Sequence, residues 1–300
     1  MYGRHLQRRP SFEMMEYYLL SALLYAECTA GIAFNLFIVA TNFQNWRTLK
    51  IIQTSDKILI CLASSRSLFF IHMMVLDFLL KFYPPFLVNL LPSSSMLVGS
   101  MFLNHINFWF ATVLCVFYCV KITNYNSSMF TFLKTRISSL VHWLLLASLP
   151  VSVAFSLPCG WFVFYIDQSK SSYDLHLLDS VVNATLTKVT VLQDLHLRFL
   201  MFIVHIRHMR RSRTGFGSPN LEVHYCAVKN MSLFLVLHVV YFVCMTVRLS
   251  PMFNMRILWR TLVIIITCIP PCLHSLYIII STKKLKETFL RWFSCSLGGK

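Results

Sequence analysis

The chain has 300 residues, of which 57% are hydrophobic and only 13% are charged, and its formal net charge is +16. Ordinary soluble domains contain roughly 25% charged residues, so this composition excludes a soluble protein with a polar surface. The sequence has no Gly-rich, Ser-rich or repetitive tract that would mark a linker, and this predicts one domain over residues 1–300.

Apolar runs recur along the whole chain. A bilayer core of about 30 Å requires about 20 helical residues, and in lipid only a helix satisfies its own backbone groups over that length. Six runs have this length, whereas the fifth is short. The fold class predicted is therefore an all-α membrane protein, a seven-transmembrane helix bundle. Its spans are expected at about residues 17–43, 58–80, 99–122, 140–165, 189–206, 226–247 and 257–280.

The distribution of Lys and Arg predicts the orientation. If the N-terminus lies outside, most of the basic residues fall in the cytoplasmic segments, as the positive-inside rule requires. We therefore expect an outer N-terminus and a cytoplasmic C-terminus. Because topology accounts for the positive charge, we expect no nucleic-acid partner.

Polar residues lie at membrane depth in the first two spans. Glu27, Gly31 and Asn35 follow one another at intervals of four and share one helix face. Arg66 lies in the cytoplasmic half of the second span, and ionisable groups at such depth mark function or pairing between helices. One hypothesis pairs Arg66 with Asn35 and with Ser275 of the seventh span as an internal switch. The alternative is a static clamp between helices.

Other ionisable groups in the spans have simpler interpretations. Asp77, near the outer end of the second span, is expected to be solvated. His238 and His274 have no Cys or His partner at ligand spacing, so we expect no metal site. His274 adjoins Ser275 and is included in the switch hypothesis.

A catalytic site is not predicted. The sequence contains no HExxH, GxSxG or P-loop pattern, no paired intramembrane aspartates and no inverted repeats of the transporter kind. We therefore expect neither an enzyme nor a cofactor.

The third span carries an aromatic stripe with two interpretations. Phe108, Trp109, Phe117 and Tyr118 are typical of the core of a bundle, and we prefer that interpretation for Phe117. Near the outer half, the alternative is that Asn107 and Trp109 line a cavity that opens to the outside.

The fifth span is the weakest. Residues 189–206 include Gln193, Asp194, His196 and Arg198. A charge near a helix centre costs about 2.5–3.5 kcal/mol on insertion scales. Three explanations stay open: a deletion that impairs the protein, an error in the predicted gene structure, or pairing of Asp194 with Arg198 on one helix face.

Four motifs carry a family resemblance. The first span contains ECTAGIAFNLFIVATN and the second contains DKILICLASSR, while the third ends in WFATVLCVFYCVKITNYN and the seventh in PCLHSLYIIISTKKLKETFLR. Together they resemble the bitter taste receptors, the taste receptor type 2 family of G-protein-coupled receptors, over five of the seven spans. The Asp-Arg-Tyr and Asn-Pro-x-x-Tyr signatures of rhodopsin-like receptors are absent from the sequence, as this resemblance would imply.

The resemblance implies a multi-pass receptor of the plasma membrane. It would bind small bitter organic molecules from outside and activate a heterotrimeric G protein of the gustducin type, because an agonist favours the active state. The family's ligand positions match Trp109, Val113 and Tyr241 and fall near Ile264, with Asn107 as a further candidate. Because Val113 and Ile264 are apolar, we expect apolar, weakly polar agonists.

The resemblance also implies coupling through the inner face. The candidate coupling residues are Lys121, Tyr125, Arg136, Arg211, Lys229 and Lys284. The spacing of apolar and basic residues in 283–295 predicts an amphipathic helix lying on the inner leaflet of the lipid bilayer. Each basic residue has the alternative interpretation of a topology signal only.

Three N-glycosylation sequons occur in the sequence. Asn183 lies in the predicted long outer loop and is expected to carry a glycan. Asn126 and Asn230 lie on the cytoplasmic side of the predicted topology, so we expect them to stay unmodified.

Two alternatives to a bitter receptor stay open. One is a pheromone-type, vomeronasal-like receptor of the same broad lineage, which the class of agonist would distinguish. The other is a non-signalling membrane protein, either a transporter or a degenerate receptor with a damaged fifth helix. Substrate flux without G-protein activation would favour a transporter, and failure to reach the cell surface would favour degeneracy.

Overall fold

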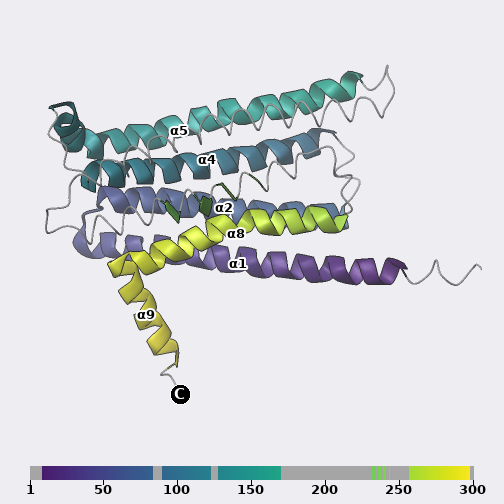
Figure 1. The fold of residues 1–300 in the computed structure, drawn as a ribbon, viewed down its shortest axis with the longest axis horizontal. Coiled ribbons are helices and arrows are strands. Elements are labelled where there is room, and N and C mark those ends of the chain that lie inside the picture. The colour runs from purple at the N-terminus through teal and green to yellow at the C-terminus, as the bar shows by residue number, and fades with distance from the viewer. Residues whose placement is uncertain are drawn as a thin grey trace, which may run out of the picture.

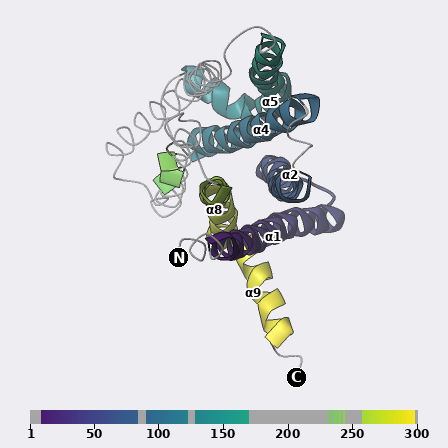
Figure 2. The same cartoon turned by 90° about the vertical axis from the view of Figure 1, so that its right-hand side faces the viewer.

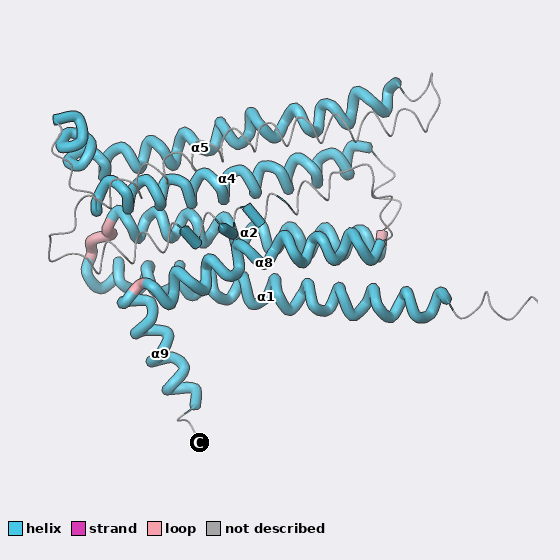
Figure 3. The backbone as a smooth tube through the Cα atoms, viewed as in Figure 1, coloured by secondary structure: helices cyan, strands magenta, loops and turns pink. Residues whose placement is uncertain are grey.

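The computed structural model describes residues 9–83, 90–122, 128–169 and 257–297, together with a few positions between 232 and 243. Within these residues the long regular elements are all α-helices (Figure 3). They are α1 (Arg9–Leu49), α2 (Thr54–Phe82), α4 (Leu90–Ile122), α5 (Ser128–Ser169), α8 (Ile257–Ser281) and α9 (Lys283–Leu297).

Five of the described helices are long and apolar enough to cross a membrane. The candidate spans are Tyr18–Leu49, Thr54–Leu79, Ser94–Tyr118, Lys134–Pro158 and Ile264–Ser281. They coincide with the first four predicted spans and with the seventh, so the prediction of a helical membrane protein is confirmed. The predicted spans at 189–206 and 226–247 lie outside the described residues, apart from isolated positions in the second of them.

Helices α1, α2, α4, α5 and α8 lie side by side along one direction, whereas α9 leaves the bundle at an angle (Figures 1 and 2). Close contacts join α4 to α5, α1 to α2, α1 to α8 and α2 to α4. At the end where α9 leaves the bundle, α1, α4 and α8 end and α2 and α5 begin (Figure 1). We call this the α9 end of the bundle. In the predicted topology it is the cytoplasmic end.

Buried apolar side chains form two clusters along the bundle. The first, toward the α9 end, includes Leu62, Leu114 and Ile279. The second lies farther from α9 and includes Phe70 and Cys268. Both clusters contain residues of α1, α2 and α8, so these three helices are packed together along much of their length.

The polarity of the bundle is reversed relative to a soluble protein. Large apolar side chains face outward, among them Leu19, 72% exposed on α1, and Trp143, 70% exposed on α5. Polar and charged side chains lie inside, among them Arg66 at 3% and Asn35 at 0% exposure. A soluble fold would lose free energy by this arrangement, whereas lipid solvates the apolar exterior and disfavours charge.

Asp77 corrects one expectation. Its exposure is 1%, so the prediction that it is solvated was wrong. The physical reason is the length of α2, which continues to Phe82. Asp77 therefore lies inside the packed part of the helix and not at a frayed end.

Two glycines allow close approach of neighbouring helices. A Cβ atom added at Gly31 of α1 would lie 2.6 Å from ring carbons of Phe70 on α2. A Cβ atom added at Gly99 of α4 would lie 3.1 Å from Cε1 of His72 on α2. The sequence placed Gly31 on the polar face of the first span. In the structure its missing side chain leaves the space that the Phe70 ring occupies.

Candidate functional site

A buried hydrogen-bonded network joins α2 to α8. Arg66 Nη1 donates to Ser275 Oγ over 3.0 Å, and Arg66 Nη2 bonds His274 Nδ1. A guanidinium group has donors only, so His274 Nδ1 must accept. The proton of the neutral imidazole therefore sits on Nε2, and the arginine is held by two neutral partners.

The network continues from α8 to α1. Ser275 Oγ lies 2.9 Å from Asn35 Oδ1 and 2.9 Å from the carbonyl oxygen of Pro271. Asn35 Nδ2 donates to the carbonyl oxygen of Gly31 over 2.7 Å, which directs its Oδ1 toward α8. Arg66, Ser275 and Asn35 thus tie three helices together in the middle of the bundle. The predicted contact of Arg66 with Ser275 is present, and Arg66 is linked to Asn35 through Ser275.

Glu27 lies on the same face of α1 but outside this network. Its two carboxylate oxygens are buried and have no hydrogen-bond partner among the described residues. Arg66 Nε is likewise buried without a partner in the described part of the chain. Glu27 Oε1 and Oε2 and Arg66 Nε are therefore polar atoms whose hydrogen-bonding capacity no described residue uses.

The candidate ligand residues on α4 face different surroundings. Asn107 Oδ1 accepts a hydrogen bond from Ser65 Oγ, so its carboxamide contacts α2 next to Arg66. Trp109 Nε1 is buried and has no hydrogen-bond partner among the described residues. Val113 is 4% exposed and packs in the cluster at the α9 end.

The remaining ligand positions lie elsewhere. Ile264 of α8 is 3% exposed and packs in the cluster farther from α9, so it and Val113 belong to different clusters. Tyr241 lies outside the residues that the structure describes.

The candidate coupling residues at the α9 end fall into two groups. Lys121 and Arg136 are exposed and lie over the rings of Phe117 and Phe132, 5.5 Å and 5.7 Å from the ring centroids. Lys284 instead bonds Asn42 and Asp56. Tyr125, Arg211, Lys229 and the glycosylation candidate Asn183 lie outside the described residues.

Two of the polar contacts between helices that sequence reasoning missed involve His72 and Lys284. His72 Nε2 of α2 lies 2.8 Å from Ser100 Oγ and 3.2 Å from the carbonyl oxygen of Met96 on α4. Ser100 Oγ donates to that carbonyl over 2.9 Å and therefore accepts from His72.

The other contact is the bond of Lys284 to Asn42. Asn42 lies seven residues after Asn35 and therefore near the same face of α1. That spacing was a usable signal.

Among the described residues no group of three or more His, Cys, Asp or Glu side chains is placed to hold a metal ion. The chemistry that the described site offers is therefore hydrogen bonding and charge within a low-dielectric bundle. Such a site can hold helices in register or exchange partners between two states.

An apolar exterior, membrane-length helices and a buried polar network together define a multi-pass helical membrane protein. The sequence profile of the family described as taste receptor protein (TAS2R) matches residues 13–297. The chain therefore belongs to the TAS2R taste receptor family, a family of receptors and not of enzymes, and the resemblance seen in its motifs is confirmed.

Individual relatives agree with this assignment. Taste receptor type 2 member 39 of Macaca mulatta is 31% identical over 291 residues, which cover 89% of this chain and 84% of the relative. The human member 39 is 30% identical over 296 residues, covering 91% and 86%. Taste receptor type 2 member 40 of Gallus gallus is 31% identical over 282 residues, covering 87% and 89%. The chain is accordingly a taste receptor of the G-protein-coupled class.

Proposed function

We propose that this receptor resides in the plasma membrane with seven spans, an outer N-terminus and a cytoplasmic C-terminus. Small bitter organic molecules bind it from outside, and the active state engages a heterotrimeric G protein of the gustducin type. The observation that carries this proposal is the family match over almost the whole chain. The reversed polarity of the bundle supports the membrane setting.

The agonist site is proposed around Trp109. A buried indole N–H without a partner costs about 1–3 kcal/mol, so an acceptor on an agonist would gain that free energy on binding. Val113 and Ile264, which pack in different clusters, are the apolar candidates, and Asn107 and Tyr241 are the polar and aromatic candidates. These surroundings favour apolar agonists with one accepting group.

The Arg66 network is proposed as the switch. An agonist shifts a two-state equilibrium only by the difference between its affinities for the two states. A hydrogen-bonded network in a low dielectric has discrete arrangements, and Arg66 Nε, which bonds none of the described residues, offers a donor for an alternative arrangement. The competing interpretation, a static clamp, predicts that breaking the network lowers stability without raising agonist-independent signalling.

Coupling is proposed at the α9 end of the bundle. The exposed basic residues Lys121 and Arg136 would face the G protein together with Tyr125, Arg211 and Lys229. Lys121 and Arg136 are steadied over aromatic rings, which lowers the conformational entropy lost on binding. The α9 helix is proposed to lie on the inner leaflet.

The direct test is calcium mobilisation in cells that express this chain with a promiscuous Gα subunit, screened against bitter compounds while surface expression is measured. A dose-dependent response at normal surface levels supports the proposal. Normal surface levels without a response to a broad panel would contradict bitter agonism. Absence from the surface would favour the degenerate-receptor alternative, for which the charged residues Asp194 and Arg198 in the fifth predicted span are the motivation.

A further inference from the structure

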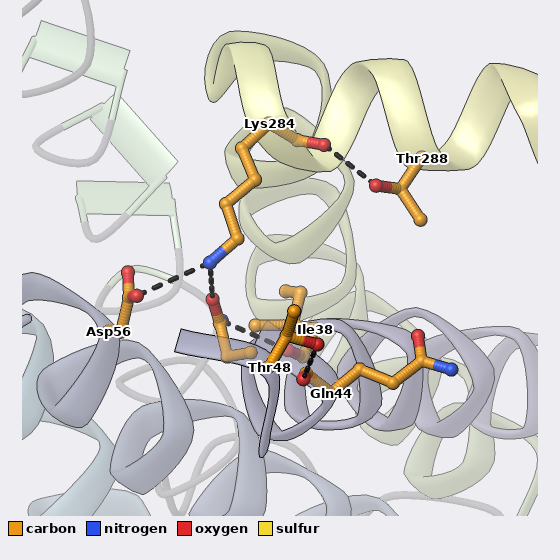
Figure 4. Close-up of polar contacts among 7 residues, drawn as sticks. Ile38, Gln44, Thr48, Asp56, Lys284 and Thr288 are labelled. Carbon is orange, nitrogen blue, oxygen red and sulfur yellow. Dashed lines mark hydrogen bonds and ion pairs between the residues drawn. The ribbon is translucent and has the colours of Figure 1, made fainter. Parts of the chain in front are cut away.

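Lys284, in the first turn of α9, reaches back into the bundle (Figure 4). Its Nζ atom lies 3.1 Å from Asn42 Oδ1 on α1 and 3.3 Å from Asp56 Oδ2 at the start of α2. Asn42 is 2% exposed, and its Nδ2 donates to the carbonyl oxygen of Ile38 over 3.0 Å. That bond fixes the Asn42 carboxamide with Oδ1 toward Lys284, so the acceptor is oriented independently of its bond to the lysine.

The three residues join the ends of three spans. Only Thr282 separates α8 from α9, so Lys284 is tied closely to the end of α8. The start of α2 is held on its other side too, because Lys57 Nζ lies 3.0 Å from His142 Nε2 of α5. Lys284 therefore bonds to a fixed part of the bundle and not to a free loop.

A second anchor holds α9 farther along. Leu285 is fully buried, and the rings of Phe289 and Trp292 meet Phe37 of α1 edge to face at centroid distances of 5.4 Å and 5.9 Å. Polar and aromatic contacts together leave α9 pointing away from the bundle axis (Figure 1).

The basic residues of α9 differ in their surroundings. Lys283, Lys286 and Arg291 are exposed, whereas the Lys284 side chain is 34% exposed and its ion-pair partner Asp56 is 15% exposed. Two of the three N–H donors of Lys284 are engaged by Asn42 and Asp56, so a lipid phosphate or an acidic protein surface would have to compete with these partners. The three exposed residues are free of that cost.

We propose that Lys284 is a positioning residue that latches α9 to α1 and α2 through Asn42 and Asp56. The surface that α9 offers to anionic partners is then formed by Lys283, Lys286 and Arg291. The consequence for coupling rests on the proposed function, whereas the latch itself does not.

The latch is tested by the reactivity of the lysines in the purified full-length chain in detergent, with acetylation measured by mass spectrometry. In the unmodified sequence Lys284 should react about fivefold more slowly than Lys283 and Lys286, which corresponds to about 1 kcal/mol. Asp56→Asn should abolish this difference. The matched control Glu287→Gln removes the acidic residue one turn along α9 and should leave the slow reaction of Lys284 unchanged.

Two results would overturn the latch. One is equal reactivity of the three lysines in the unmodified chain, and the other is a Lys284 that stays slow in Asp56→Asn. If Glu287→Gln releases Lys284 instead, the protection comes from pairing within α9 and the proposal is wrong.

A charge exchange links the latch to coupling. Lys284→Glu and Asp56→Lys should each lower the melting temperature of the detergent-solubilised receptor and its G-protein activation. The double variant should restore part of both, because it re-forms the ion pair but not the hydrogen bond to Asn42 Oδ1. Lys283→Glu makes the same change of charge without touching the latch and should leave the melting temperature near that of the parent. A double variant no more stable than the weaker single variant would contradict the proposal. Because lysine reactivity and melting need no agonist, failure of the taste-receptor assay would leave the latch result intact.

Discussion

Arg66 shows how one residue organises its surroundings. Its planar guanidinium group bonds both His274 and Ser275, and Ser275 in turn bonds Asn35. A lysine is a point charge on a flexible stem and cannot reproduce that geometry. Among the described residues, the cost of burying this charge is offset by hydrogen bonds to neutral groups and not by a bonded carboxylate.

We expect Arg66→Lys to lower the free energy of unfolding by about 1–3 kcal/mol, because one buried acceptor loses its donor. Thermal unfolding in detergent measures this, with the exposed Arg47→Lys as the matched control. If the network is a switch, agonist-independent signalling should also change. A variant as stable as the parent, with unchanged basal signalling, would exclude both interpretations.

Trp109 carries a second prediction at this scale. Trp109→Phe keeps the aromatic body and removes the N–H that has no hydrogen-bond partner in the described part of the chain. Agonists with an accepting group should lose about tenfold in potency, equivalent to about 1.4 kcal/mol, whereas purely apolar agonists should lose less. Dose–response curves at matched surface expression measure this. Equal losses for both kinds of agonist would argue against a hydrogen bond from Trp109.

At the scale of elements, small residues decide which helices can close on one another. Gly31 leaves room for the Phe70 ring between α1 and α2, and Gly99 leaves room for His72 between α2 and α4. His72 then bonds Ser100, which lies beside Gly99. Close approach and hydrogen bonding therefore occur at the same crossing.

We expect Gly31→Ala to destabilise the receptor by about 1–3 kcal/mol, because a methyl group 2.6 Å from the Phe70 ring forces the two helices apart. The second variant, Phe70→Leu in the Gly31→Ala background, should recover part of the loss. Gly99→Ala should cost less, because its nearest contact is 3.1 Å. Thermal unfolding of these three variants and of Phe70→Leu alone tests the order, and an additive double variant would contradict direct contact.

At the scale of the whole molecule, orientation in the membrane decides which end meets agonist and which meets the G protein. The α9 end carries exposed Lys121, Arg136, Lys283 and Lys286. Anionic lipid of the inner leaflet attracts such residues. This attraction places the α9 end on the cytoplasmic side in the proposed topology. Only sequons at the opposite end of the bundle should then carry a glycan.

We expect Asn183→Gln to abolish the mobility shift that a glycosidase produces in the receptor from mammalian cells. Asn126→Gln and Asn230→Gln should leave that shift unchanged, because the glycosylation machinery acts on the outer side only. Electrophoresis before and after enzyme treatment measures this. A glycan at Asn126 would invert the proposed orientation.

Several features could be predicted from the sequence because they depend on local composition. Five apolar runs became membrane-length helices, since a run of about 20 apolar residues in lipid has no alternative to the helix. The pairing of Arg66 with Ser275 and Asn35 was also accessible, because an arginine at membrane depth must find polar partners and few exist. The family followed from motifs that are read without any structure.

Other features depended on neighbours distant in sequence. Lys284 looks like Lys283 and Lys286 in the sequence, yet it alone among these three bonds Asp56, more than two hundred residues away. Asp77 is buried within the packed part of α2, and Asn107 contacts Ser65 because α2 and α4 pack together. Local sequence determined which segments cross the membrane and which family they belong to, since hydropathy and motifs are properties of contiguous residues. Only the tertiary structure decided which polar side chains are satisfied inside the bundle, since a hydrogen bond requires a partner within about 3 Å from another helix.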